Sequence, residues 1–472
     1  MISYTFNDNT KIPIYEQLYI QIKNDILSGK LSANKRLPSK RNFANQLSIS
    51  VITVENAYNQ LLSEGFIYSL PRKGFYVSEI FKESYELADR RKANNTDDST
   101  HTVFYYENSK DASHNDERQY FADFSSNATD PSSFPFSTWA KLTRRILSDD
   151  QSFLMKNSPS NGIFLLRDAI ASYLQAYRGI NVSPDSIIIG AGTETMYNIL
   201  IQLIGHHRIY ACEKPGYKKI SEILNANEVE NLQIPMDESG VIPSELEKNG
   251  VNIIHTTPSH HFPTGITMPV KRRYELLSWA TSAEDRYIIE DDYDSEFRLS
   301  GRPIPALFST DTNGKIIYMN TFTKSLASTI RISYMILPPE LLNKYYQRLS
   351  FYSCTVSTFE QLTLAHFISE GYYEKHINRM RTAYRKKRDY LLSCIKDSGL
   401  GNISEINEEQ SGLHFILKLK LKIPEEKFLK NLEENDIHIV STAPQSYMIN
   451  YSSIPLNKIS EAINRINAAT NK

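Results

Sequence analysis

The feature that most constrains this chain is a pair of apolar runs, each ending in chemically reactive side chains. Residues 286–294 read Arg-Tyr-Ile-Ile-Glu-Asp-Asp-Tyr-Asp, and residues 318–326 read Tyr-Met-Asn-Thr-Phe-Thr-Lys-Ser-Leu. In an open α/β sheet, ligands bind in the crevice at the carboxyl ends of the strands. We therefore expect Asp291, Tyr293 and Lys324 to converge on one cleft.

These three side chains suit pyridoxal 5'-phosphate (PLP). A lysine amine forms a Schiff base with the aldehyde, and a carboxylate pairs with the pyridinium nitrogen, which keeps the ring an electron sink. The phenol of Tyr293 is suited to hydrogen-bond the ring hydroxyl. Thr321, Thr323 and Arg331 lie around Lys324 in the sequence and offer donors for a phosphate. Taken singly, a solvated lysine or a capping aspartate explains each residue better, so the prediction rests on their combination.

The order Asp-x-Tyr and then Thr-x-Thr-Lys resembles the fold-type I aminotransferases over about residues 120–472. The resemblance implies an α/β fold with PLP bound through Lys324. It also implies that the glycine-rich turn Gly192-Thr193-Glu194 holds the PLP phosphate at a helix N-terminus. Relatives often carry an amide at the third position, so we expect Glu194 to contribute only its backbone. Tyr217 would stack on the ring, with a purely structural turn tyrosine as the alternative.

One segment departs from the aminotransferase pattern. Ordinary aminotransferases read Asn-Pro-Thr-Gly and use the asparagine to bind the ring hydroxyl, whereas this chain has Phe262 before Pro263. His260 or His261 is the candidate replacement, and a structural histidine is the alternative.

The first eighty residues read as three short helices and a hairpin. Apolar residues recur at helical spacing over 13–29, a second helical stretch runs through residue 47, and Ser50 suits the cap of a third helix. Two short apolar runs then flank a Pro-Arg-Lys-Gly turn. This order predicts a winged helix-turn-helix.

Positive charge is concentrated where such a domain would meet DNA. Residues 1–80 hold nine lysines and arginines and six acids, a net charge of +3, and the cations cluster at 35–41 and 72–73. Most short helical hairpins with scattered lysines bind no DNA. However, Leu-Pro-Ser-Lys-Arg at 37–41 and Arg-Lys-Gly-Phe-Tyr-Val at 72–77 resemble the DNA-binding domain of the GntR family. The resemblance implies contacts to double-stranded operator DNA from Arg36, Ser39, Arg41, Thr53, Asn56, Arg72 and Lys73.

Two further segments resemble the MocR subfamily of GntR regulators, in which a GntR-type domain is fused to an aminotransferase-like domain. They are Pro-Ser-His-x-Phe-Pro at 258–263 and Glu-Asp-Asp-Tyr-Asp-Ser-Glu-Phe at 290–297. The resemblance then covers essentially the whole chain. We expect a winged helix over 1–80, a flexible linker over 81–120, and a PLP-binding effector domain over 121–472 with a small lobe from about 400.

The linker prediction rests on composition. Residues 81–120 contain neither glycine nor proline, and fifteen of the forty are charged with both signs mixed, so they cannot bury a core. A flexible chain of this length spans on the order of 30–40 Å. We therefore expect a homodimer, domain-swapped head to tail, in which a DNA-binding domain sits on the opposite subunit.

The remaining composition indicates a soluble cytoplasmic protein. The net charge is −1, so any nucleic-acid surface must be local. The three cysteines are far apart and show no metal-ligand spacing, so we expect no metal site. No apolar run is long enough to cross a bilayer.

The C-terminal part lacks a residue that working aminotransferases use. They hold the substrate α-carboxylate with an arginine in the small lobe, because a guanidinium pairs with a carboxylate through two hydrogen bonds. No arginine lies between Arg388 and Arg465. A cation-rich stretch before this gap most simply forms a solvated helix face, with a DNA path as the alternative: Arg379, Arg381, Arg385, Lys386, Lys387 and Arg388.

Three functions remain open. The chain resembles the PdxR branch, in which a MocR-type regulator senses PLP itself and controls vitamin B6 synthesis, with the aminotransferase-like fold used as a sensor and not as an enzyme. The alternatives are a GabR-like regulator that responds to an amino acid such as GABA through its bound PLP, and an active aminotransferase. The missing arginine favours the first.

Overall fold

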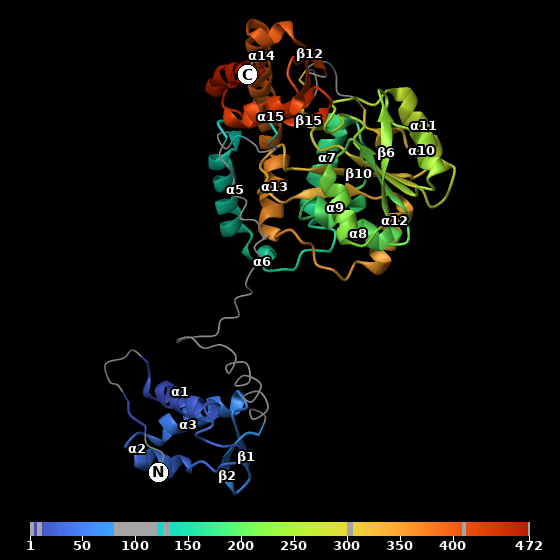
Figure 1. Cartoon of the computed structure of the whole chain (residues 1–472). Coiled ribbons are helices and arrows are strands. Elements are labelled where there is room, and N and C mark those ends of the chain that lie inside the picture. Colours follow the sequence, from blue (N-terminus) through green and yellow to red (C-terminus); the bar gives the residue numbers. More distant parts are fainter. Residues whose placement is uncertain are drawn as a thin grey trace. The chain divides into compact units, whose positions relative to one another are not determined.

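A computed structural model of the chain describes residues 4–6, 12–79, 120–125, 130, 133–299, 305–407 and 412–470. The chain divides into two compact units, Met1–His114 and Asn115–Lys472 (Figure 1). Apart from residue 120, the expected linker over 81–120 lies outside the described residues. In the described part of the chain, no helix combines the length and the apolar character needed to cross a membrane.

The N-terminal unit is the winged helix-turn-helix that the sequence predicts. Its elements are α1 (Ile14–Leu27), α2 (Lys40–Leu47), α3 (Val51–Ser63), β1 (Ile67–Leu70) and β2 (Gly74–Val77). The side chains of Ser39 and Ser50 cap α2 and α3 by accepting hydrogen bonds from the backbone N–H groups of Asn42 and Thr53. The two strands pair antiparallel. Fully buried Tyr58 donates to the carbonyl of Pro38, which fixes the segment between α1 and α2 against α3.

The second unit is built on an eight-stranded sheet with the order β4-β11-β10-β9-β8-β5-β6-β7. Strands β6, β5, β8, β9 and β10 run parallel, and β11 and β7 are antiparallel to their neighbours. The bounds are β4 (Ile187–Gly190), β5 (Tyr210–Lys214), β6 (Asn231–Asp237), β7 (Gly240–Val241), β8 (Ile253–Thr256), β9 (Tyr287–Asp291), β10 (Ile316–Thr321) and β11 (Ser333–Ile336).

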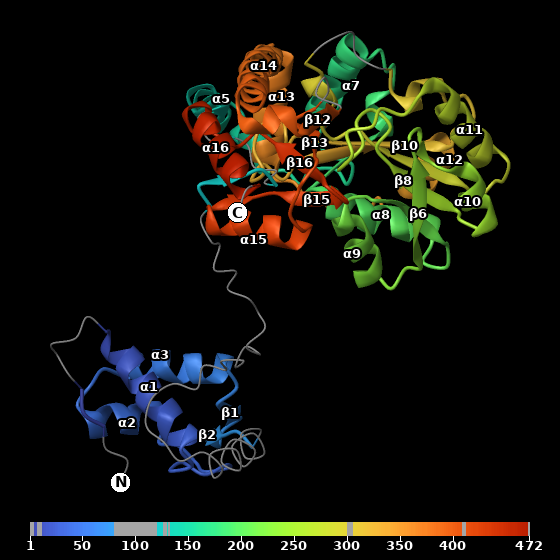
Figure 2. The same cartoon turned by 45° about the horizontal axis from the view of Figure 1, so that its top comes forward.

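Helices cover both faces of this sheet. Successive residues of one strand point to opposite faces, so Ile289 packs in the cluster under α8, α9 and α12, while Ile288 packs in the cluster under α10 and α11. Figure 2 shows α8 and α9 on one side of the sheet and α7 on the other. The bounds are α5 (Phe136–Asp149), α6 (Gln151–Leu154), α7 (Phe164–Arg178), α8 (Thr193–Ile204), α9 (Lys218–Ala226), α10 (Pro243–Lys248), α11 (Val270–Thr281), α12 (Pro339–Arg348) and α13 (Thr358–Ser369).

A small lobe follows the long helix α14 (Tyr372–Asp397). Its four-stranded antiparallel sheet has the order β12-β13-β16-β15. The short strand β14 pairs instead with β3, which lies near the start of the same unit. The bounds are β3 (Ala122–Asp123), β12 (Ser404–Asn407), β13 (His414–Leu419), α15 (Glu425–Glu434), β14 (Ile437–His438), β15 (Val440–Ala443), β16 (Ser446–Asn450) and α16 (Ile459–Ala469).

The predicted solvated face of α14 is confirmed only in part: Arg379, Arg385 and Lys386 are exposed, but Lys387 is buried and Arg381 and Arg388 are partly buried. Arg381 donates to the carbonyl of Glu296, and Arg385 donates to that of Leu299. Lys387 is buried and donates to the carbonyl of Ser452. These cations therefore tie α14 to the loop after β9 and to the small lobe.

Candidate functional site

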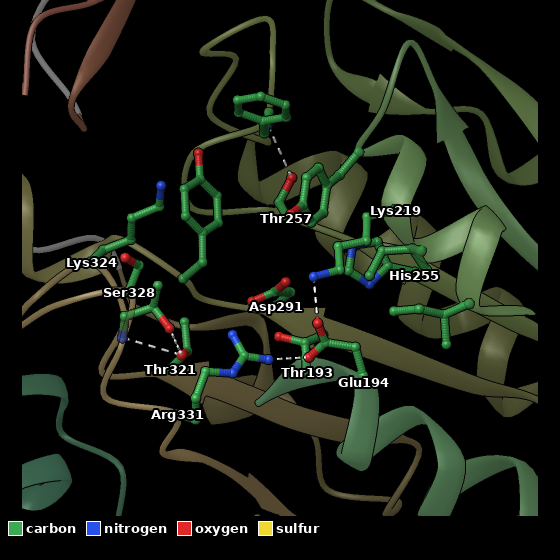
Figure 3. A pocket seen from close by; sticks show the side chains of 16 residues that line it. Thr193, Glu194, Lys219, His255, Thr257, Asp291, Thr321, Lys324, Ser328 and Arg331 are labelled. Atoms are coloured by element: carbon green, nitrogen blue, oxygen red, sulfur yellow. Dashed lines mark hydrogen bonds and ion pairs between the residues drawn. The ribbon is translucent and has the colours of Figure 1, made fainter. Parts of the chain in front are cut away.

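A pocket of about 350 Å³ opens where β9 and β10 end and α8 begins (Figure 3). Small-molecule sites commonly have volumes of this size. Its lining residues come from α8, α9 and its N-cap, from β8, β9 and β10, and from the segments that follow those three strands. They are Thr193, Glu194, Tyr217, Lys219, Ile220, Ile223, His255, Thr257, Phe262, Asp291, Tyr293, Thr321, Thr323, Lys324, Ser328 and Arg331.

One end of the pocket is built to hold an anion. Gly192 precedes the first turn of α8 with a φ of 88°, in the left-handed region that favours glycine. A Cβ at Gly192 would lie 2.2 Å from Arg331 Nη2, so a side chain there would displace that guanidinium from its position. The hydroxyls of Thr321 and Thr323 lie 2.7 Å apart and face the same end. A helix N-terminus, two hydroxyls and a guanidinium together form a cradle for a phosphate.

The side chain of Glu194 enters this cradle, which the sequence did not indicate. Arg331 Nη2 donates to Glu194 Oε2 over 2.5 Å, and the Lys219 ammonium donates to Glu194 Oε1 (Figure 3). Although burial alone would raise the pKa of Glu194, the contacts with Lys219 and Arg331 lower it below its usual value. Glu194 is therefore a carboxylate held between two cations.

The other end of the pocket carries groups that titrate near neutral pH. Burial, together with the neighbouring carboxylates of Asp292 and Asp294, raises the pKa of Asp291 to about 7. Burial lowers the pKa of the Lys324 amine to about 8, although the carboxylate of Asp294 opposes this shift. An amine with this pKa is partly neutral at physiological pH, and the neutral form is the one that attacks an aldehyde.

The aromatic residues of the pocket surround the space between its two ends. Tyr217 is 40% exposed. Its ring meets that of Phe262 edge to face at 5.7 Å, and Phe262 meets Tyr293 in the same way at 6.5 Å. His255, near the end of β8, forms a hydrogen bond between its Nδ1 and the Tyr197 hydroxyl over 2.6 Å. Burial lowers the pKa of His255 to about 4. His255 is therefore neutral at pH 7.

The two histidines proposed to replace the missing asparagine do not line the pocket. His260 Nδ1 lies 2.8 Å from Asp294 Oδ2 and 3.3 Å from the Tyr293 hydroxyl. It is therefore within hydrogen-bond distance of Tyr293 without lining the pocket. His261 Nδ1 lies 2.7 Å from the hydroxyl of Thr264. Phe262 itself occupies the wall, and Thr257 and His255 supply polar atoms there.

The small lobe reaches Lys324 without an arginine. His414 of β13 packs its ring 4.5 Å from that of His260 and 5.6 Å from that of Phe262. Burial lowers the pKa of His414 well below its usual range, and the charges of His260 and Lys324 lower it further. Gly412 is needed for this packing, because a Cβ there would lie 1.9 Å from His260 Cε1. Arg465 is on α16, where it pairs with Glu461.

The structure brings nine of the ten predicted cofactor-binding residues into the pocket wall, and the tenth, Gly192, forms the turn beneath it. Lys219, His255 and Thr257 also line the pocket, and the sequence did not indicate them. Lys219 lies in the first turn of α9 and belongs to no recognisable motif. His255 and Thr257 belong to a run that reads as an ordinary buried strand.

The donor set fits PLP. Lys324 would hold the aldehyde carbon, Asp291 the ring nitrogen and Tyr293 the ring hydroxyl. The cradle of Gly192, Thr193, Thr321, Thr323 and Arg331 would hold the phosphate. When bound, PLP supplies an electrophilic carbonyl and an electron-withdrawing ring.

The predicted DNA contacts lie on exposed or partly exposed positions of the N-terminal unit. Arg36 and Arg41 flank Ser39, the cap of α2, and both side chains are exposed. Asn56 is exposed on α3, whereas the hydroxyl of Thr53 is engaged by Ser50 over 2.7 Å. Arg72 and Lys73 form the exposed turn between β1 and β2, and Arg72 has a φ of 61°.

Two family models match this chain. The family described as "Bacterial regulatory proteins, gntR family" matches residues 14–77. The family "Aminotransferase class I and II" matches residues 122–466.

Curated relatives match along nearly the whole chain. The sequence is 38% identical to the uncharacterized HTH-type transcriptional regulator YdeL of Bacillus subtilis (strain 168), over 98% of each chain. It is 28% identical to the probable rhizopine catabolism regulatory protein MocR of Rhizobium meliloti, over 97% of this chain and 94% of the relative. It is 27% identical to the pyridoxine biosynthesis transcriptional regulator PdxR of Corynebacterium glutamicum, over 87% of this chain and 84% of the relative.

Solved structures share the fold of the second unit. The multiple substrate aminotransferase of Thermococcus profundus superposes with a TM-score of 0.64 at 24% identity, over 75% of this chain and 91% of that enzyme. This likeness confirms the predicted fold-type I architecture.

Proposed function

This chain belongs to the MocR-type transcriptional regulators, in which a GntR-family domain precedes an aminotransferase class I and II domain that binds PLP, and on this premise we propose that its effector is PLP itself. The genes it controls would then include those of vitamin B6 synthesis. The aminotransferase-like unit serves as a sensor and not as an enzyme.

One observation carries the choice of PLP over an amino acid: the pocket offers no second anchor for a carboxylate. Among the described residues that line it, Arg331 is the only arginine, and it is paired with Glu194. Near Lys324 the chain offers the carboxylate of Asp294, which follows β9, and the ring of His414 in the small lobe, which is neutral because burial lowers its pKa well below the usual range.

An amino-acid ligand would be poorly held in this environment. Its α-carboxylate would face the Asp294 carboxylate and the neutral His414 ring, and burying a charge without a partner is costly. PLP would have an anchor at three positions, namely Lys324 at the aldehyde, Asp291 at the ring nitrogen and the Arg331 cradle at the phosphate. A ligand shifts a conformational equilibrium only by its differential affinity for the two states, and these anchors make PLP the ligand that can supply it.

Two alternative functions keep some support. The name of the PdxR relative agrees with a role in pyridoxine biosynthesis, whereas other relatives carry names from other pathways. A regulator that answers to an amino acid or GABA through bound PLP is therefore the second candidate. An active aminotransferase is the third, because the fold is that of enzymes such as the T. profundus protein.

Binding to operator DNA would use the N-terminal unit in a homodimer. The exposed cations at Arg36, Arg41, Arg72 and Lys73 support phosphate contacts. The second unit exposes large apolar side chains, Met155 at 75% and Phe351 at 76%, which a contact between two copies would cover. We propose the domain-swapped, head-to-tail arrangement for this dimer.

The test compares operator binding by the full-length chain without and with PLP, and then with PLP plus a panel of amino acids and GABA. PLP alone should change operator affinity, and the panel should add little. An unchanged affinity with PLP followed by a response to one amino acid would establish the second candidate, and transamination at an enzyme-like rate the third. Arg41→Ala should weaken binding in both states and reduce the salt dependence by about one unit of slope.

A further inference from the structure

The carboxylate of Glu194 lies where an incoming phosphate must bind. It lies in the first turn of α8, where the helix macrodipole favours negative charge. It contacts both cations of the cradle, Lys219 through Oε1 and Arg331 through Oε2. Figure 3 shows Glu194 between Lys219 and Arg331, with a dashed line to each. A negative group of the chain itself thus engages both cations of the cradle.

The three side chains are solvated enough to exchange partners. Their exposed fractions are 35% for Glu194, 43% for Lys219 and 46% for Arg331. Ion pairs with this exposure contribute little free energy, because water and salt screen them. The carboxylate can therefore leave the cations when another anion arrives, without unfolding the surrounding turn.

The charge of the cradle decides how strongly it attracts that anion. Lys219 and Arg331 carry two positive charges and Glu194 cancels one of them. A phosphate therefore meets a net charge of +1 beside a carboxylate, and not a bare pair of cations. Like charges at close range are unfavourable, so the carboxylate must move aside or weaken the contact.

We propose that Glu194 is an internal competitor for the phosphate subsite, which lowers the affinity of the pocket for phosphorylated ligands and so keeps PLP binding reversible. This inference rests on the proposed function, because it takes PLP as the ligand. The side-chain carboxylate of Glu194, and not only its backbone N–H, then acts at the phosphate subsite. A sensor needs such a device, since a pocket saturated at every PLP concentration would report nothing.

The isosteric change Glu194→Gln separates this role from others. The glutamine keeps the length and shape of the side chain and removes its charge. Pyridoxal, which has the aldehyde and ring of PLP but no phosphate, reports on the other end of the pocket. Glu247→Gln is the matched control, because Glu247 also pairs with an arginine, Arg286, in the same unit (Oε2 to Nη1, 2.7 Å) and does not line the pocket.

The experiment measures the dissociation constants of PLP and pyridoxal for the full-length chain and both variants, by absorbance titration. Glu194→Gln should bind PLP about two- to fivefold more tightly, with pyridoxal affinity unchanged. Glu247→Gln should match the wild type for both ligands.

Three results would overturn the proposal. An unchanged or weaker affinity of Glu194→Gln for PLP would mean that Glu194 only positions Lys219 and Arg331. An equal change for PLP and pyridoxal would place the effect outside the phosphate subsite. If the wild type takes up no PLP, the proposed function fails as well, whereas normal wild-type uptake with a flat Glu194→Gln result defeats the competitor role alone.

Discussion

The two ends of the pocket hold charge in opposite ways. At the phosphate end, Glu194, Lys219 and Arg331 are about one third to one half exposed and neutralise one another in ion pairs. At the ring end, burial brings the pKa of Asp291 up to about 7 and that of Lys324 down to about 8. Solvated charges set how strongly the pocket attracts an anion, whereas desolvated groups set which protonation states it offers to the ring and aldehyde.

This difference predicts which contacts matter most. An exposed ion pair contributes up to about 1 kcal/mol, whereas a hydrogen bond to a charged group in a desolvated site contributes about 1.5–3 kcal/mol. Substitutions at the ring end should therefore weaken PLP binding more than substitutions at the phosphate end.

Among the noncovalent contacts, the largest loss of affinity should follow Asp291→Asn, because the neutral amide cannot form an ion pair with a ring nitrogen that carries a proton. We expect PLP binding to weaken by about ten- to a hundredfold, as measured by absorbance titration. Asp237→Asn is the control, since Asp237 pairs with Arg272 at the end of β6, outside the pocket. Unaltered PLP affinity in Asp291→Asn would remove Asp291 from the site.

A medium effect should appear in the stability of the ligand-free chain. The pKa of Asp291 rises from 3.8 to about 7 on folding, so the folded state keeps a proton that the unfolded state releases. Stability is therefore lost as pH rises from about 4 to about 7, and the penalty is constant above that window.

Between pH 6 and pH 8 the ionisation of Asp291 should lower the free energy of unfolding by about 1.4 kcal/mol, and this loss should be absent in Asp291→Asn. Denaturant unfolding followed by tryptophan fluorescence reports on the unit Asn115–Lys472, which holds Asp291, because both tryptophans, Trp139 and Trp279, lie in it. Glu290 and Glu296 also have pKa values raised to about 7 by burial, so the comparison must be between wild type and variant. Identical pH profiles would show that Asp291 is ionised throughout.

The smallest effect should come from Lys219→Ala. The Lys219 ammonium is 43% exposed and already paired with Glu194, so we expect only a severalfold loss of PLP affinity that high salt diminishes. Titrations at low and high ionic strength measure it. If Lys219→Ala lost more PLP affinity than Asp291→Asn, the contacts to the phosphate would matter more than those to the ring, contrary to this expectation.

The sequence predicted which residues gather at the pocket, but not how Glu194 is paired there, for a physical reason. Asp291 and Lys324 follow neighbouring parallel strands, and strand ends meet at one edge of a sheet whatever the side chains do. The pairing of Glu194 with Lys219 depends instead on how α8 and α9 pack, and no local pattern encodes that distance. The hydrogen bonds of Arg381 and Arg385 on α14 were not predicted for the same reason, since their acceptors are carbonyls about 85 residues away in the sequence.

The identity of the lysine that holds PLP tests the account most directly. Of the described residues that line the pocket, two are lysines, Lys219 and Lys324, and they lie at its opposite ends. PLP-loaded protein should be reduced with borohydride, digested, and its peptides analysed by mass spectrometry, alongside Lys324→Ala and Lys219→Ala. We predict the cofactor mass on Lys324 in the wild type and in Lys219→Ala, and no fixed cofactor in Lys324→Ala. A label on Lys219, or a labelled Lys324→Ala protein, would contradict the assignment of the two ends.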